Sequence, residues 1–197
     1  MMELMKSSIK AIIGNIVSAE EFLDEEKLDK FENMIIDANN IFVTGAGRSG
    51  LAAKAFAMRL MHLGLSSYVV GETISPAINA DDCIVAISGS GETNTIVSAA
   101  KIAKNRGSKV LAVTSYPDST LGQLADGHLL VKGRTKKEVD DENYMKRQIH
   151  GNYTSLTPLG TAFELTTLVF LDAIVSELME KMEQTESDLK ARHTVLE

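Results

Sequence analysis

Short apolar runs alternate with helical segments five times along the central part of the chain. The predicted strands are residues 41–44, 68–70, 84–87, 110–114 and 129–131. Continuous apolar strands separated by helices are typical of a parallel sheet that is covered on both faces. In such a sheet, ligands bind outside the carboxyl ends of the strands, where the connecting loops gather. The alternation therefore predicts one α/β domain over residues 1–197, with its site at that edge of the sheet.

Helices flank the predicted sheet in the sequence. We expect N-terminal helices over residues 1–38, the sheet core over 40–132, a C-terminal helix over 157–182 and a polar tail over 183–197. In the first segment, apolar residues recur at helical spacing, and Asp24 is placed to cap a second helix. These two helices could close an edge of the sheet or pack against another copy of the chain.

The last long helix is predicted to begin with Thr157 as N-cap and Pro158 at its first position. From Ala162 to Val175 it is apolar on nearly every side, so it needs cover all round. We therefore expect a neighbouring subunit to share this helix. Before it, the segment from Gly133 to His150 is highly charged without an apolar period, which predicts a mobile surface segment.

Composition narrows the classes of partner and compartment. The 197 residues carry a formal net charge of −7 without a basic run, so neither nucleic acid nor an anionic membrane is an expected partner. No uncharged apolar stretch reaches the ~18 residues that span a bilayer, and no signal peptide is evident. The single cysteine, Cys83, lies in an apolar run and suits a reducing compartment. We expect a cytoplasmic protein.

One predicted strand runs into a loop rich in glycine and serine, within the segment Ile84-Val-Ala-Ile-Ser-Gly-Ser-Gly-Glu-Thr-Asn94. Glycines let the backbone approach a ligand, and the start of the next helix offers unpaired N–H groups. Ser88, Ser90 and Thr93 add hydroxyl groups, and Glu92 is predicted to lie in the first turn of the helix. The loop suits a phosphate. An ordinary strand-to-helix turn has the same composition, so this stretch alone leaves both interpretations open.

A second glycine-rich loop, Gly45-Ala-Gly-Arg-Ser-Gly50, fits the dinucleotide pattern G-x-G-x-x-G after a strand. Glu72 follows the next strand, about where an acid would bind the ribose. A nicotinamide enzyme is therefore one hypothesis. Against it, the chain has no second domain for a dehydrogenase substrate, and the hydroxyl-rich loop at 88–93 suits a phosphomonoester better.

Glu164 and His193 are the candidate proton-transfer residues. Glu164 lies among apolar residues in the second turn of the predicted last helix, where burial would raise its pKa towards the range of a general base. Alternatively, it is a helix-start carboxylate that faces solvent or an ion-pair partner. His193 lies in the polar tail and could equally be a surface residue. The other histidines show no metal-site spacing, so no metal site is predicted.

Three motifs together resemble the sugar isomerase (SIS) domain family, and most closely its 6-phospho-3-hexuloisomerase branch. They are Gly45-Ala-Gly-Arg-Ser49, Ile87-Ser-Gly-Ser-Gly-Glu-Thr93 and Thr157-Pro-Leu-Gly-Thr-Ala-Phe-Glu164, in this order and spacing. Residues 55–64, 70–76, 114–122 and 192–197 extend the resemblance over nearly the whole chain. It implies a doubly wound three-layer α/β/α sandwich with a five-stranded parallel sheet of flavodoxin type. It also implies a homotetramer whose active sites draw on neighbouring subunits.

The resemblance further implies a sugar-phosphate substrate and residue roles. Glu164 would be the catalytic base, and His193 would reach into a neighbour's site. The substrate and its phosphate would be held by Gly47, Arg48, Ser49, Ser88, Gly89, Ser90 and Thr93. The implied reaction converts 3-hexulose 6-phosphate to fructose 6-phosphate through a 2,3-enediol, without a cofactor, in the ribulose monophosphate pathway. Another SIS sugar-phosphate isomerase and a non-catalytic sugar-phosphate sensor remain alternatives.

Overall fold

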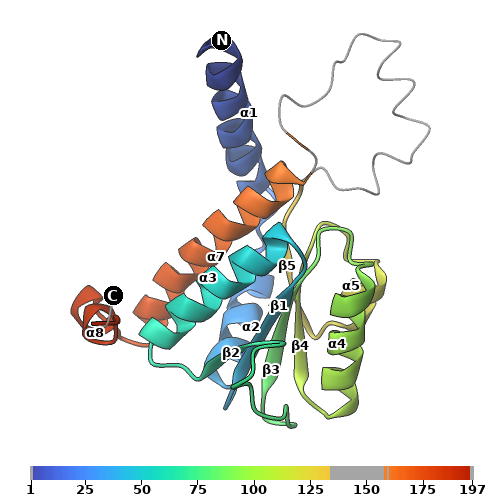
Figure 1. The fold of residues 1–197 in the computed structure, drawn as a ribbon, viewed down its shortest axis with the longest axis vertical. Coiled ribbons are helices and arrows are strands. Elements are labelled where there is room, and N and C mark those ends of the chain that lie inside the picture. The colour runs from blue at the N-terminus through green and yellow to red at the C-terminus, as the bar shows by residue number, and fades with distance from the viewer. Residues whose placement is uncertain (1, 134–157, 159, 196–197) are drawn as a thin grey trace.

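The fold is known from a computed structural model that describes residues 2–133, 158 and 160–195. Five parallel strands form one sheet in the order β2-β1-β3-β4-β5 (Figure 1). The strands are β1 (Ile41–Gly45), β2 (Ser67–Val69), β3 (Cys83–Ile87), β4 (Lys109–Thr114) and β5 (Gly127–Leu130). All five coincide with the predicted strands apart from shifts at their ends. The predicted fold class is therefore confirmed.

Helices cover both faces of this sheet (Figure 1). The helices are α1 (Met2–Glu20), α2 (Glu25–Ile36), α3 (Arg48–His62), α4 (Asn94–Asn105), α5 (Thr120–Leu124), α7 (Thr161–Lys181) and α8 (Glu186–Ala191). Side chains of α2, α3 and α7 pack with Val43 and Val85 on one face. Those of α4 and α5 pack with Phe42 and Ile84 on the other. Neighbouring side chains of a strand thus point to opposite helix layers, as the pleat of the sheet requires.

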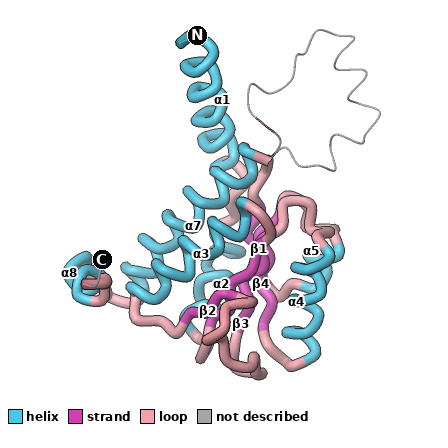
Figure 2. The backbone as a smooth tube through the Cα atoms, viewed as in Figure 1, coloured by secondary structure: helices cyan, strands magenta, loops and turns pink. Residues whose placement is uncertain are grey.

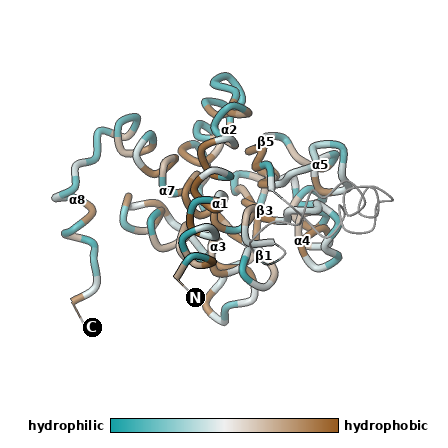
Figure 3. The backbone as a smooth tube through the Cα atoms, turned by 90° about the horizontal axis from the view of Figure 1, so that it is seen from above, coloured by the Kyte–Doolittle hydropathy of each residue, from teal (hydrophilic) through white to brown (hydrophobic). Residues whose placement is uncertain are grey.

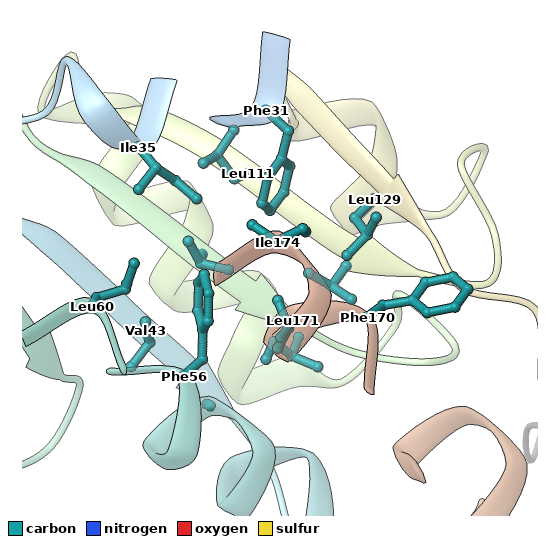
Figure 4. Packing of buried hydrophobic residues seen from close by; sticks show 14 of the residues in the cluster. Phe31, Ile35, Val43, Phe56, Leu60, Leu111, Leu129, Phe170, Leu171 and Ile174 are labelled. Atoms are coloured by element: carbon teal, nitrogen blue, oxygen red, sulfur yellow. The ribbon is translucent and has the colours of Figure 1, made fainter. Parts of the chain in front are cut away.

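The larger core lies under α7. Figure 4 shows side chains of α2, α3 and α7 converging over the strands, among them Phe31, Phe56 and Ile174. Burying each such side chain stabilises the fold by roughly 1.5–3 kcal/mol. Cys83 is also fully buried in β3, and burial raises the pKa of its thiol to about 12, with a further contribution from Asp82. The thiol therefore stays protonated and acts as a small core residue.

The two N-terminal helices have different surroundings. α2 is capped as predicted, because the Asp24 side chain accepts a hydrogen bond from the Lys27 amide, and it lies against the edge strand β5. α1 projects from the body (Figure 1). The C-terminal end of α1, where Ala19 is buried, packs on α7. Apolar side chains therefore remain exposed along α1. Figure 3 shows that hydrophobic residues recur along this helix. The exposed ones are Met2, Leu4, Met5, Ile9, Ile13 and Val17.

The start of the last long helix was predicted wrongly. α7 begins at Thr161 after Gly160, whose φ of +88° is open to glycine at little cost, so Pro158 precedes the helix. Thr157 and the charged segment up to His150 lie outside the described residues. The polar tail contains a helix that the sequence reading missed, α8, which Thr185 and Asp188 cap reciprocally. Within the described ranges, none of the helices is both long and apolar enough to cross a membrane.

Candidate active site

The loop between β1 and α3 is a tight turn that only glycine allows. A Cβ on Gly45 would lie 2.6 Å from the carbonyl oxygen of Ser49, and one on Gly50 would lie 2.7 Å from that of Gly45. Gly47 has a φ of +59°, and its carbonyl accepts a hydrogen bond from the Gly50 amide. This close approach explains the glycine spacing without a dinucleotide. It places Arg48 and Ser49 in the first turn of α3, at the carboxyl edge of the sheet.

The loop between β3 and α4 gathers hydroxyl groups. The Oγ atom of Ser88 lies 2.9 Å from Oγ1 of Thr93, and the Ser90 hydroxyl accepts a hydrogen bond from the Glu92 amide. Within the described chain, Thr93 is the N-cap of α4 but makes no side-chain capping bond to it. The first N–H groups of this helix therefore point towards the loop, where an anion can accept from them.

Glu92 does not have its predicted place in the first turn of α4, because the helix begins at Asn94. Its carboxylate instead accepts hydrogen bonds from the amide and the hydroxyl of Thr120, at 2.9 and 2.7 Å. The carbonyl oxygen of Gly89 accepts from the Ser115 amide, and that of Gly91 accepts from the Leu121 amide. The loop after β4 and the start of α5 thus fix the shape of the serine-rich loop.

Gly91 shows how closely these loops approach each other. Its φ is +66°, and a Cβ there would lie 1.8 Å from Oγ of Ser119. Ser119 in turn caps α5 and donates a hydrogen bond to the carbonyl oxygen of Tyr116. Ser119 and Thr120 are therefore supporting residues that the sequence analysis did not single out. Figure 2 shows both loops at the same end of the sheet as the beginning of α7.

Glu164 meets the glycine loop from the other side of the site. Its Oε2 atom lies 3.0 Å from Nε of Arg48, and the two side chains are 19% and 51% exposed. Nη1 of Arg48 donates to Oγ1 of Thr161, one helical turn before Glu164. Glu164 lies in the first turn of α7, not the second, because the helix starts later than predicted. The carboxylate is thus mostly buried and paired with a cation of the candidate site.

His193 lies elsewhere in the same chain. Its ring stacks on His62, the last residue of α3, whereas Arg48 is the first residue of that helix. At 1.5 Å per residue the two ends of α3 are about 20 Å apart. One chain therefore does not bring His193 to Glu164. His150 lies outside the described residues. Among those that the structure describes, no group of three or more His, Cys, Asp or Glu side chains could hold a metal ion.

Glu72, the candidate ribose ligand of the dinucleotide hypothesis, is paired with Lys54. Their carboxylate and ammonium groups lie 2.7 Å apart, and the ion pair lowers the pKa of Glu72. Lys54 lies on α3, so the pair ties the segment after β2 to that helix. A ribose hydroxyl would have to compete with this cation. The geometry gives the dinucleotide hypothesis no support beyond the glycine spacing.

Comparison with known proteins gives the family. The SIS domain model matches residues 34–143. An uncharacterised protein of Archaeoglobus fulgidus is 48% identical over 189 residues, which cover 96% of this chain and 98% of that protein. The 3-hexulose-6-phosphate isomerase of Bacillus subtilis is 35% identical over 96% of this chain and 97% of its own. The crystal structure of a Methanococcus jannaschii protein, inferred to be a 3-hexulose-6-phosphate isomerase, matches with a TM-score of 0.79. It is 35% identical, over 96% of this chain and 98% of that one. The protein therefore belongs to the SIS domain family.

Proposed function

We propose that this protein is a sugar-phosphate isomerase that interconverts 3-hexulose 6-phosphate and fructose 6-phosphate. The observation that carries the proposal is the contact between Glu164 and Arg48 at the edge of the sheet where the serine-rich loop suits a phosphate. A mostly buried carboxylate is a candidate base, and an adjacent guanidinium can stabilise a developing oxyanion. The relatives with this activity cover almost the whole chain, which favours it over a different sugar phosphate.

The phosphate of the substrate would bind at the serine-rich loop. Ser88, Ser90 and Thr93 offer hydroxyl groups there, and the uncapped start of α4 offers amide donors. Gly89 would allow close backbone approach, while Gly47 and Ser49 would contact the substrate from the loop after β1. Anchoring the phosphate away from the reacting carbons uses binding energy to orient the sugar.

Glu164 would act on the carbon chain. It removes the proton from C2 of 3-hexulose 6-phosphate, and the electron pair forms a 2,3-enediolate whose charge lies on O3. Returning the proton at C3, with transfer of the hydroxyl proton from O2 to O3, gives fructose 6-phosphate. Arg48 stabilises the enediolate oxygen. No electrons leave the substrate, so this scheme uses no redox cofactor. The proposed reaction belongs to the ribulose monophosphate pathway.

His193 of a neighbouring subunit would carry the proton between the two oxygens. The proposal is supported by its distance from Glu164 within one chain and by its exposed position. It requires an oligomer, for which we propose a homotetramer. The exposed apolar side chains of α1, together with Val169 on α7, offer surfaces for such an assembly.

Proton NMR of fructose 6-phosphate incubated with the protein in D₂O tests this function. We expect deuterium to enter at C3, because the 2,3-enediol is reprotonated there from exchanged Glu164. Entry at C1 would indicate an aldose–ketose isomerase that uses a 1,2-enediol. If no exchange occurs, turnover of 3-hexulose 6-phosphate itself decides between internal proton transfer and a sensor that only binds. Binding of NADH in a fluorescence titration would instead support the nicotinamide alternative.

A further inference from the structure

Two histidines stack at the C-terminal end of α3. The ring centroids of His62 and His193 lie 4.9 Å apart, with 25° between the ring planes. His62 is 3% exposed and closes the helix, whereas His193 follows α8 and is exposed. A buried aromatic ring under an exposed one restricts the orientations of the exposed ring. The stack is therefore a mechanical support for His193.

Arg192 fastens the tail beside this stack. Its Nη1 atom donates hydrogen bonds to the carbonyl oxygen of His62 and to Oε1 of Gln184, both at 3.0 Å. The guanidinium lies across Gly64, where a Cβ would come within 3.2 Å of its Cζ atom. A cation at the C-terminal end of a helix also complements the helix dipole. The segment that carries His193 is thus held on α3 by the residue next to it.

The charges around His62 keep its ring neutral. Burial lowers the pKa of His62, and the neighbouring His193 and Arg59 lower it further. Arg59 on α3 is paired with Asp172 of α7 at 3.5 Å, and Arg192 faces the stack from the tail, where the carbonyl oxygen of Asp188 accepts from it. Two stacked imidazolium rings would repel each other. His62 therefore contributes a neutral ring to the stack.

We propose that His62 is a positioning residue for His193. Its neutral ring fixes the orientation in which His193 enters the active site of a neighbouring subunit, and it leaves His193 as the member of the pair that exchanges protons with the substrate. This inference rests on the proposed isomerase activity. The pairing of the rings, however, can be measured without any turnover.

The kinetic test compares two substitutions of His62. Removing the ring in His62→Ala should lower kcat by about 10- to 100-fold, because a misplaced proton-transfer group costs rate, and should leave KM within about twofold. His62→Phe keeps a flat ring and should restore most of kcat. His128→Gln is the control, because His128 is a partly buried histidine on β5 whose Nε2 atom lies by the carbonyl oxygen of Gly122, away from this stack. Thermal unfolding shows whether each variant is folded at the assay temperature.

An unchanged kcat in His62→Ala, or an equal loss in His62→Phe, overturns the proposal. The second test is an NMR titration of the ring protons of His62 in the native protein and in His193→Ala. Its pKa should lie below the ordinary histidine value and rise in the variant. An unchanged pKa would show that the rings do not interact, and would overturn the proposal even if His62→Ala does not fold. If the native protein lacks isomerase activity but this pKa change is seen, the proposed function fails while the stack stands.

Discussion

Nε of Arg48 and Oε2 of Glu164 lie 3.0 Å apart, which joins the first residue of α3 to the first turn of α7. Gly160 contributes to this arrangement, because its Cα faces the carboxylate so closely that a Cβ would lie 3.0 Å from Oε1. The carboxylate is therefore held before a substrate arrives. Arg48 is half exposed and can turn from Glu164 to a sugar oxygen. The contact between Arg48 and Glu164 thus places a cation and a candidate base in the same site.

Replacing Glu164 by Gln should abolish turnover and leave binding nearly intact. The amide keeps the shape of the side chain but cannot accept the proton, and loss of a general base costs about 10²- to 10⁴-fold in rate. We expect kcat to fall by this factor, while calorimetry with fructose 6-phosphate gives a Kd within a few-fold of the native value. Glu180→Gln, which removes an exposed carboxylate from the same helix, is the control. Retention of most activity would refute the base assignment.

Removing the hydroxyl groups of the serine-rich loop should weaken substrate binding. Ser88→Ala and Thr93→Val each delete one member of the 2.9 Å contact. A hydrogen bond to a charged group contributes roughly 1.5–3 kcal/mol, so KM should rise by about tenfold or more in each variant. Ser98→Ala removes an exposed hydroxyl from α4 and should leave KM unchanged. If both loop variants keep the native KM, the phosphate binds elsewhere.

The sheet was predictable because each strand is a short, largely apolar run, and β1, β3 and β4 end at or just before glycine, serine or threonine. The supporting contacts of the site were not, because they join loops that are distant in sequence. Glu92 illustrates the difference. Local patterns place an acid in the first turn of a helix, yet the Glu92 carboxylate binds Thr120 at the start of α5. Arg48 and Glu164 were each identified as site residues, but only the packing of α3 on α7 reveals their contact.

Helix starts were harder to predict, since competing signals lie within a few residues of each other. Pro158 favours the first turn of a helix, but Gly160 with its positive φ determines where α7 begins. α8 was missed although Thr185 and Asp188 form a capping box, because a six-residue polar helix has no apolar period. Its place against α3 depends on Arg192, which no local pattern indicates.

Glu32 should make the protein less stable as the pH rises. It is 2% exposed, and burial raises its pKa more than the ion pair with Lys181 at 2.8 Å lowers it. A carboxyl group with a raised pKa contributes stability below its unfolded pKa and loses it as the pH rises through the folded value. Glu32→Gln stays neutral at every pH. It should therefore melt roughly 2–4 °C above the native protein at pH 8.

This difference should vanish near pH 4, where the native carboxyl group is mostly protonated. Asp29 provides the control, because the same lysine lies 2.6 Å away and lowers the pKa of this exposed group. Asp29→Asn should be destabilising at pH 8 and neutral at low pH, the opposite dependence. Differential scanning calorimetry of both variants against pH measures the two signs. A lower melting temperature of Glu32→Gln at pH 8 would mean that the Lys181 pair outweighs burial.

Mixing two inactive variants tests whether active sites are shared between subunits. Glu164→Gln lacks the base and His193→Ala lacks the second proton carrier, so each should be inactive alone. A hybrid site that takes Glu164 from one chain and His193 from another is intact. Random reassembly after joint refolding should therefore restore roughly a quarter of the native rate per chain.

If instead His193 served its own chain, every site in the mixture would lack one group and no activity would return. Refolding each variant separately and mixing the products under conditions without subunit exchange is the control, and it should stay inactive. Within one chain, His193 and Glu164 lie at opposite ends of α3, roughly 20 Å apart. Recovered activity would therefore mean that a neighbouring subunit brings its own His193 to Glu164. The activity of the refolded mixture therefore reports whether His193 of one subunit acts together with Glu164 of another.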